Sequence, residues 1–80
     1  MNTPKIVVYG ADWCPLTTRA LTHLERKGLD FEYIDIEDDE DAARWVRAQN
    51  GGKERKPTIR IGDRILIEPS DAEIDQALVS

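Results

Sequence analysis

The composition of this 80-residue chain limits the classes of protein to which it can belong. Hydrophobic residues make up 40% and charged residues 34%, which fits a folded globular domain and excludes wholesale disorder. The formal net charge of −5 argues against nucleic acid as the main partner. No apolar run approaches the roughly 20 residues of a membrane span, and residues 1–9 do not resemble a secretory signal. We therefore expect one domain over residues 1–80 with neither a nucleic-acid nor a membrane partner.

The chain has a single cysteine, Cys14, and a single histidine, His23. One cysteine excludes any intramolecular disulfide, and its scarcity favours a reducing compartment, the cytoplasm. One cysteine and one histidine cannot complete a tetrahedral zinc site, so we expect no structural metal. His23 is several helical turns from Cys14, and we expect it to pack in the core or on the surface.

The first half of the chain predicts two strands and two helices. Residues 5–9 are a short β-branched run, which indicates a buried strand that stops at Gly10. Residues 15–28 begin with a proline suited to a first helical turn and end with a glycine suited to a C-terminus. Residues 31–36 are rich in aromatic and β-branched side chains and predict a second strand. Residues 38–49 start with acids and predict a second helix.

The second half predicts a hairpin and a closing helix. Residues 58–61 and 64–67 flank Gly62-Asp63, a signature of a tight hairpin. Ser70 and Glu73 form a capping-box pattern at the start of the last helix. The order βαβαββα predicts an α/β domain with a mixed four-stranded sheet. Its first two strands are expected to be parallel, and the helices are expected to cover both faces.

The position of Cys14 favours a reactive thiol. It directly follows the first strand and a short loop and directly precedes Pro15 and the first helix. The sulfur is therefore expected to face solvent near unpaired backbone N–H groups at the positive end of a helix dipole, which should lower the pKa of the thiol. The alternative is a buried cysteine that packs as a small hydrophobe. Trp13 beside it is either a lid over the sulfur or part of the core.

A second feature is Pro57, which lies immediately before the third predicted strand. It is either ordinary punctuation before a strand or a cis proline, whose turn would leave neighbouring backbone groups free for an extended, peptide-like ligand.

These features together resemble the glutaredoxin family. Residues 8–15, Val-Tyr-Gly-Ala-Asp-Trp-Cys-Pro, match the active-site approach of small bacterial glutaredoxins, and the resemblance spans nearly the whole chain. Asn50-Gly51-Gly52, Lys56-Pro57-Thr58 and Pro69-Ser70 look most like mycoredoxin-type members. The resemblance implies a thioredoxin-like fold and thiol–disulfide exchange with glutathione or a similar low-molecular-weight thiol.

The resemblance also implies which residues bind the substrate. Pro57 would be a cis proline facing Cys14, and the backbone of Lys56 would pair with the cysteinyl part of glutathione. Ser70 and Asp71 would hold the γ-glutamyl end, where free N–H groups at a helix start suit a carboxylate. The backbone of Asp71 is the expected contact, because its side chain would repel a carboxylate. Trp13 and Pro15 complete the expected groove.

The chain departs from the family's Cys-x-x-Cys pattern at Thr17, which stands where the resolving cysteine would be. A dithiol cycle is therefore excluded, and only a monothiol route through Cys14 remains. Thr17 either donates a hydrogen bond to the Cys14 thiolate or bonds back to a helix carbonyl. Monothiol relatives often share a [2Fe–2S] cluster between two subunits, but they carry glycine where this chain has Pro15. We therefore expect no tightly bound cofactor and a monomer.

Charge is unevenly distributed along the chain. Residues 30–41 hold eight acids and no base, and residues 44–64 hold seven bases and two acids. Lys53, Arg55 and Lys56 lie beside the expected cis proline and could attract a thiol that carries carboxylates. The alternative is that both blocks are solvated faces.

Two other functions remain open from the sequence. In one, the fold keeps its groove but Thr17 has ended redox turnover, which leaves a binding module for a thiol or a protein. In the other, Cys14 and Arg19 handle an oxyanion, as in arsenate-reductase-like relatives. The second is disfavoured because Arg19 lies more than one helical turn from the sulfur.

Overall fold

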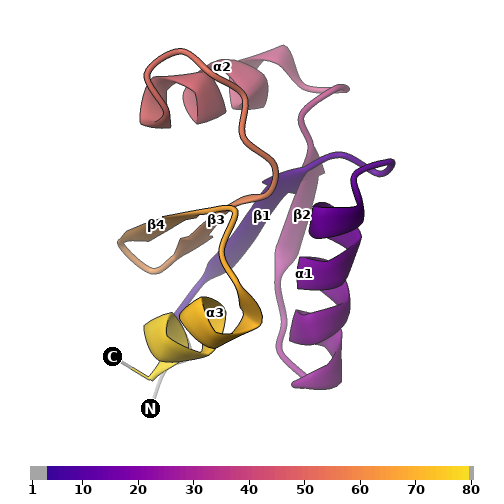
Figure 1. Cartoon of the computed structure of the whole chain (residues 1–80), viewed down its shortest axis with the longest axis vertical. Coiled ribbons are helices and arrows are strands. Elements are labelled where there is room, and N and C mark those ends of the chain that lie inside the picture. Colours follow the sequence, from indigo (N-terminus) through magenta and orange to yellow (C-terminus); the bar gives the residue numbers. More distant parts are fainter. Residues whose placement is uncertain (1–3, 80) are drawn as a thin grey trace.

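The computed structural model describes residues 4–79, and its strands form one four-stranded sheet (Figure 1). The strands lie in the order β2-β1-β3-β4, so the first strand is central and the last is at an edge. β1 pairs with β2 in parallel and with β3 antiparallel, and β3 and β4 form an antiparallel hairpin. This is the mixed sheet that the sequence predicts. The strand bounds are Ile6–Gly10 (β1), Glu32–Asp35 (β2), Thr58–Ile61 (β3) and Arg64–Ile67 (β4).

Helices cover both faces of the sheet, as the sequence also predicts (Figure 1). α1 (Pro15–Arg26) and α3 (Asp71–Leu78) pack on one face, where Leu24 and Ile74 are fully buried. α2 (Glu40–Gln49) packs on the other face through Val46. None of the helices within residues 4–79 is long and apolar enough to cross a membrane.

The alternation of side chains along the strands produces these two apolar layers. Ile6 and Val8 point to the face of α1 and α3, and Val7 and Tyr9 point to the face of α2. All five residues of β1 are buried, because this strand lies inside the sheet and both of its faces are covered. The central strand therefore forms a rigid base for the loop that follows it, which carries Cys14.

Several predicted boundaries need correction. Gly10 belongs to β1 instead of ending it, because it pairs with Asp35 across the parallel ladder. β2 is shorter than residues 31–36 and covers Glu32–Asp35. α2 begins at Glu40 rather than at Asp38, because the side chain of Asp39 accepts a hydrogen bond from the Ala42 N–H at 3.0 Å and caps the helix.

The predicted hairpin and capping box are confirmed. Gly62 has a φ of 60° in the turn between β3 and β4, a conformation that glycine adopts without strain. The hydroxyl of Ser70 accepts from the Glu73 N–H at 3.1 Å, and the Glu73 carboxylate accepts from the Ser70 N–H at 2.8 Å. These reciprocal bonds fix where α3 begins.

Candidate active site

Cys14 is the N-cap residue of α1, and Pro15 occupies the first helical turn. The Cys14 N–H donates to the carbonyl of Ala11 at 3.0 Å, which closes the loop between β1 and α1. The residue is only 8% exposed, so the expectation of a solvent-facing side chain is wrong. The sulfur is covered because it is turned toward the chain that precedes β3.

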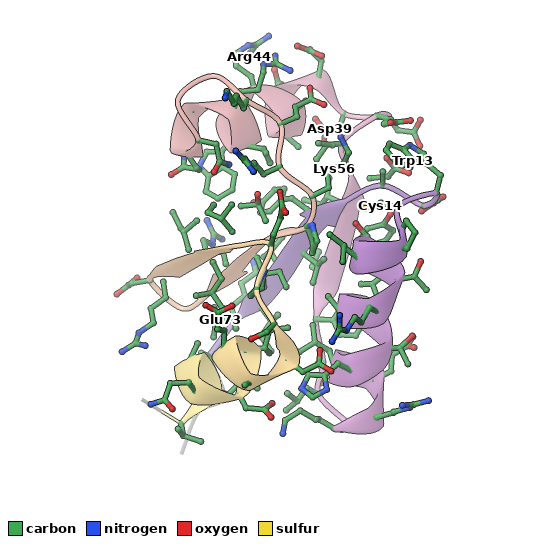
Figure 2. All side chains as sticks on the ribbon, in the orientation of Figure 1. Trp13, Cys14, Asp39, Arg44, Lys56 and Glu73 are labelled. Carbon is green, nitrogen blue, oxygen red and sulfur yellow. The ribbon has the colours of Figure 1, made fainter. Side chains whose placement is uncertain are left out.

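The chain before β3 contains a cis peptide bond between Lys56 and Pro57, which confirms the cis alternative. The Cys14 thiol donates to the carbonyl oxygen of Lys56, with an S···O distance of 3.9 Å. Within residues 4–79 the N–H of Lys56 has no hydrogen-bond partner. Figure 2 shows Cys14 and Lys56 near each other at the end of the sheet where α1 begins.

The pKa of the Cys14 thiol is lowered from its ordinary value of 9.0. Burial opposes ionisation, but hydrogen bonds from the N–H and hydroxyl of Thr17 and the N–H of Leu16 outweigh it. The positive charge of Lys56 acts in the same direction. The predicted direction is therefore confirmed, and its cause is the donors at the start of α1.

Thr17 is fully buried behind the sulfur. Its hydroxyl oxygen accepts from the Ala11 N–H at 3.4 Å, which leaves the hydroxyl proton for Cys14. The other predicted role, a bond back to a helix carbonyl, is filled by the neighbouring Thr18, whose hydroxyl donates to the Cys14 carbonyl at 3.4 Å. A Cβ added at Gly10 would lie 2.5 Å from the Thr17 side chain, so glycine is needed there for close approach.

Trp13 is 63% exposed, so the alternative that places it in the core is wrong. Its indole N–H donates to a carboxylate oxygen of Glu37 at 2.7 Å. The ammonium of Lys56 lies 5.3 Å from the centroid of the Trp13 ring. These contacts hold the indole at the surface beside Cys14 (Figure 2), while a role as a lid stays a prediction.

The comparisons with known proteins agree with this geometry. The Glutaredoxin family model matches residues 6–66, which include Cys14 and the cis proline. The chain belongs to the glutaredoxin family. It is 36% identical over 58 residues to Mycoredoxin 1 of Corynebacterium glutamicum, which is 72% of this chain and 71% of that protein.

Two solved structures show that this glutaredoxin has the thioredoxin-like fold of the family. The glutaredoxin from Archaeoglobus fulgidus superposes with a TM-score of 0.80 at 26% identity, covering 95% of this chain and 86% of that one. The glutaredoxin-like protein NrdH-redoxin from Escherichia coli superposes with a TM-score of 0.81 at 26% identity, covering 90% and 92%. The family and the fold support a thiol-oxidoreductase function.

The loop of this glutaredoxin that carries Cys14 is tied to the end of β2 by contacts that sequence reasoning missed. The Tyr33 hydroxyl donates to the Asp12 carboxylate at 2.7 Å, and the Asp12 N–H donates to the Asp35 carboxylate at 3.2 Å. Burial, the bond to Asp12 and the charge of Asp35 all raise the pKa of Tyr33. Tyr33 is therefore a neutral donor that orients this loop. The only sign of these contacts in the sequence is the pair of acidic residues at positions 12 and 35.

The start of α3 holds Ser70 and Asp71, the residues predicted to hold the γ-glutamyl end of glutathione. The Ser70 N–H is already bound by Glu73, so the N–H groups of the first helical turn at Asp71 and Ala72 are the donors left for a ligand. The Asp71 carboxylate lies 3.6 Å from Nδ1 of His23. The ring of His23 also hydrogen-bonds Asp75 at 2.8 Å, so it joins α1 to α3, in line with its expected packing role.

The basic segment before β3 is mostly paired. Arg55 lies 3.6 Å from Glu68, and the ammonium of Lys56 lies 3.6 Å from Glu54. Lys53 is exposed and forms no ion pair with any of residues 4–79. Its attraction for an anionic thiol stays a prediction. Across the same described residues, no group of three or more His, Cys, Asp or Glu side chains is arranged to hold a metal ion.

Proposed function

We propose that this glutaredoxin is a monothiol oxidoreductase in which Cys14 exchanges with mixed disulfides of glutathione or a similar low-molecular-weight thiol. The observation that carries the proposal is the position of the Cys14 sulfur. It lies at the start of α1, with a lowered pKa, and faces the backbone of the cis Lys56-Pro57 bond. A thiolate there has an extended chain beside it with which a peptide-like thiol can pair.

The first step transfers the small thiol to the protein. The Cys14 thiolate attacks the glutathione sulfur of the mixed disulfide, and the substrate's sulfur leaves as a thiolate and takes up a proton. The backbone of Lys56 pairs with the cysteinyl part of the glutathione. Pro57 and Pro15 line the groove, Trp13 borders it, and Ser70 and Asp71 mark the end that receives the carboxylate.

The second step regenerates the enzyme. Because Thr17 replaces a resolving cysteine, the adduct waits for a second glutathione, whose thiolate attacks the glutathione sulfur and releases oxidised glutathione. Thr17 donates to the departing Cys14 thiolate and stabilises it. No resident cofactor takes part in this cycle. We further propose that the protein acts as a monomer in the cytoplasm, where thiols stay reduced.

The proposal is tested by intact mass after incubation with oxidised and then reduced glutathione. We expect one glutathione to add to the wild type, rapidly, and to be removed rapidly. The Cys14→Ser variant should acquire none. An adduct that forms slowly, or that persists in reduced glutathione, would contradict the proposed cycle.

The second candidate is a redox-inactive binding module. The low exposure of Cys14 favours it, because a covered sulfur is harder for a disulfide to reach. This candidate predicts that glutathione or a protein partner binds Cys14→Ser as tightly as the wild type by titration calorimetry. Binding that depends on Cys14 would exclude it.

A further inference from the structure

Lys56 is the cation whose charge favours ionisation of the Cys14 thiol, and its backbone carbonyl accepts from that thiol at 3.9 Å. Its side chain is 15% exposed, and its ammonium lies between the Glu54 carboxylate, at 3.6 Å, and the ring of Trp13. A lysine side chain is long and flexible, so its ammonium acts at a fixed point only when contacts restrain it. The position of this charge therefore depends on what holds Glu54 and Trp13.

Glu54 is held from α2. Arg47 donates to its carboxylate at 2.6 Å through Nη1 and to Glu40 at 2.8 Å through Nη2. Arg47 lies in the last turn of α2, on the opposite face of the sheet from α1. The two bonds use both ends of the guanidinium fork, which fixes the direction in which Arg47 presents its charge.

Trp13 is held from the segment after β2. Its indole N–H bonds to Glu37, so the ring cannot turn away from Lys56 without losing this hydrogen bond. The contacts therefore run from Glu40 through Arg47, Glu54 and Lys56 to Trp13 and Glu37. They join α2 to the loop of Cys14 without passing through the apolar core.

We infer that Arg47 is a positioning residue for the thiolate of Cys14, acting through Glu54 to keep the Lys56 ammonium beside the sulfur. Arg47 neutralises and restrains Glu54, so that this carboxylate guides the lysine instead of drawing it away from Trp13. The inference rests on the proposed function, in which the Cys14 thiolate is the nucleophile. It assigns a part in that chemistry to a side chain of α2.

The test is the rate at which iodoacetamide alkylates Cys14 as a function of pH, which reports the thiolate fraction. We expect Lys56→Met to slow alkylation by about three- to tenfold near neutral pH, since a nearby positive charge favours the thiolate. Arg47→Gln should slow it by about two- to threefold, and Arg47→Lys should restore part of the rate because it keeps the charge but not the fork.

Arg44→Gln is the matched control. Arg44 is also on α2 and also pairs with an acid, Asp41 at 3.0 Å, but it lies outside this set of contacts (Figure 2). Its loss changes the net charge equally and should leave the alkylation profile as in the wild type. Far-UV circular dichroism should show that each variant is folded.

The decisive measurement combines two changes. In the Lys56→Met background, Arg47→Gln should have no further effect on alkylation, because the charge that it positions is gone. The inference would be overturned if Arg47→Gln slowed alkylation equally with and without Lys56. It would also be overturned if Arg47→Gln slowed alkylation no more than Arg44→Gln does. If glutathione exchange is rapid but either of those results is obtained, the role of Arg47 is refuted and the proposed function is not. If the alkylation rates follow the expected pattern but no glutathione exchange is seen, the proposed function is refuted and the role of Arg47 is not.

Discussion

The hydroxyl of Thr17 can be removed while its shape is kept, by the substitution Thr17→Val. This hydroxyl accepts a hydrogen bond from the Ala11 N–H and, as a donor to Cys14, lowers the pKa of the thiol. A hydrogen bond to a charged group contributes about 1.5–3 kcal/mol, and about 1.4 kcal/mol is a tenfold change in an equilibrium constant. Leu16, the Thr17 backbone and Lys56 still favour the thiolate in the variant, so we take the lower end. We expect a thiolate fraction about tenfold lower at mildly acidic pH.

The assay is the pH dependence of alkylation by iodoacetamide, with Thr17→Ser as the matched control. Serine keeps the hydroxyl and loses only a methyl group, so it should cost some stability but retain a rate close to the wild type. Valine should shift the whole alkylation profile to higher pH. The reasoning is refuted if valine reacts as fast as threonine, or if serine is as slow as valine, because the effect would then come from packing.

Three further predictions concern stability, each measured by urea unfolding. The bond from the histidine at residue 23 lowers the pKa of Asp75 from its ordinary value of 3.8. The ionised carboxylate therefore stabilises the fold at pH values above 3.8, and this contribution is lost as the pH falls through the folded pKa. Between pH 5 and about pH 3 the Asp75→Asn variant should lose less stability than the wild type, and equal losses would contradict this. Gly10→Ala should cost about 1–3 kcal/mol through the contact with Thr17, and adding Thr17→Ala should recover part of it, whereas additive costs would exclude the contact as the cause. The lowered pKa of Cys14 means that the folded state binds fewer protons than the unfolded state below pH 9.0. The stability of the reduced wild type should therefore rise as the pH approaches 9.0, and that of Cys14→Ser should not. Parallel pH profiles for the two proteins would contradict this prediction.

The order of elements was predictable because each one has a local signal. The glycine at residue 62, the capping box at Ser70 and the proline at residue 15 mark a turn and two helix starts, and all three act there as expected. The boundaries were less predictable where a tertiary contact decides them. Gly10 looks like a strand terminator in sequence, but its role is to admit Thr17, which is seven residues away in the chain.

The candidate site was predictable where the chain itself determines the chemistry. The position of Cys14 before a helix was enough to give the direction of its pKa shift. The burial of the sulfur was missed, because it depends on the approach of Lys56, 42 residues further along. The roles of Tyr33 and Arg47 were missed for the same reason. Their partners are distant in sequence, and a charged or aromatic residue alone does not reveal which group it will meet.

The complete burial of Thr17 affects what a partner molecule can detect. Residue 17 contributes nothing to the molecular surface, so an incoming disulfide meets the same exterior whether threonine or cysteine stands there. Discrimination between the two therefore cannot rest on the shape of the exterior and begins with the reactivity of Cys14, to which the Thr17 hydroxyl contributes. A two-cysteine relative with the same exterior would therefore compete with this chain for every encounter. Under the proposed monothiol cycle, the ratio of the two proteins would then set how many mixed disulfides are resolved by a second cysteine and how many wait for an external thiol.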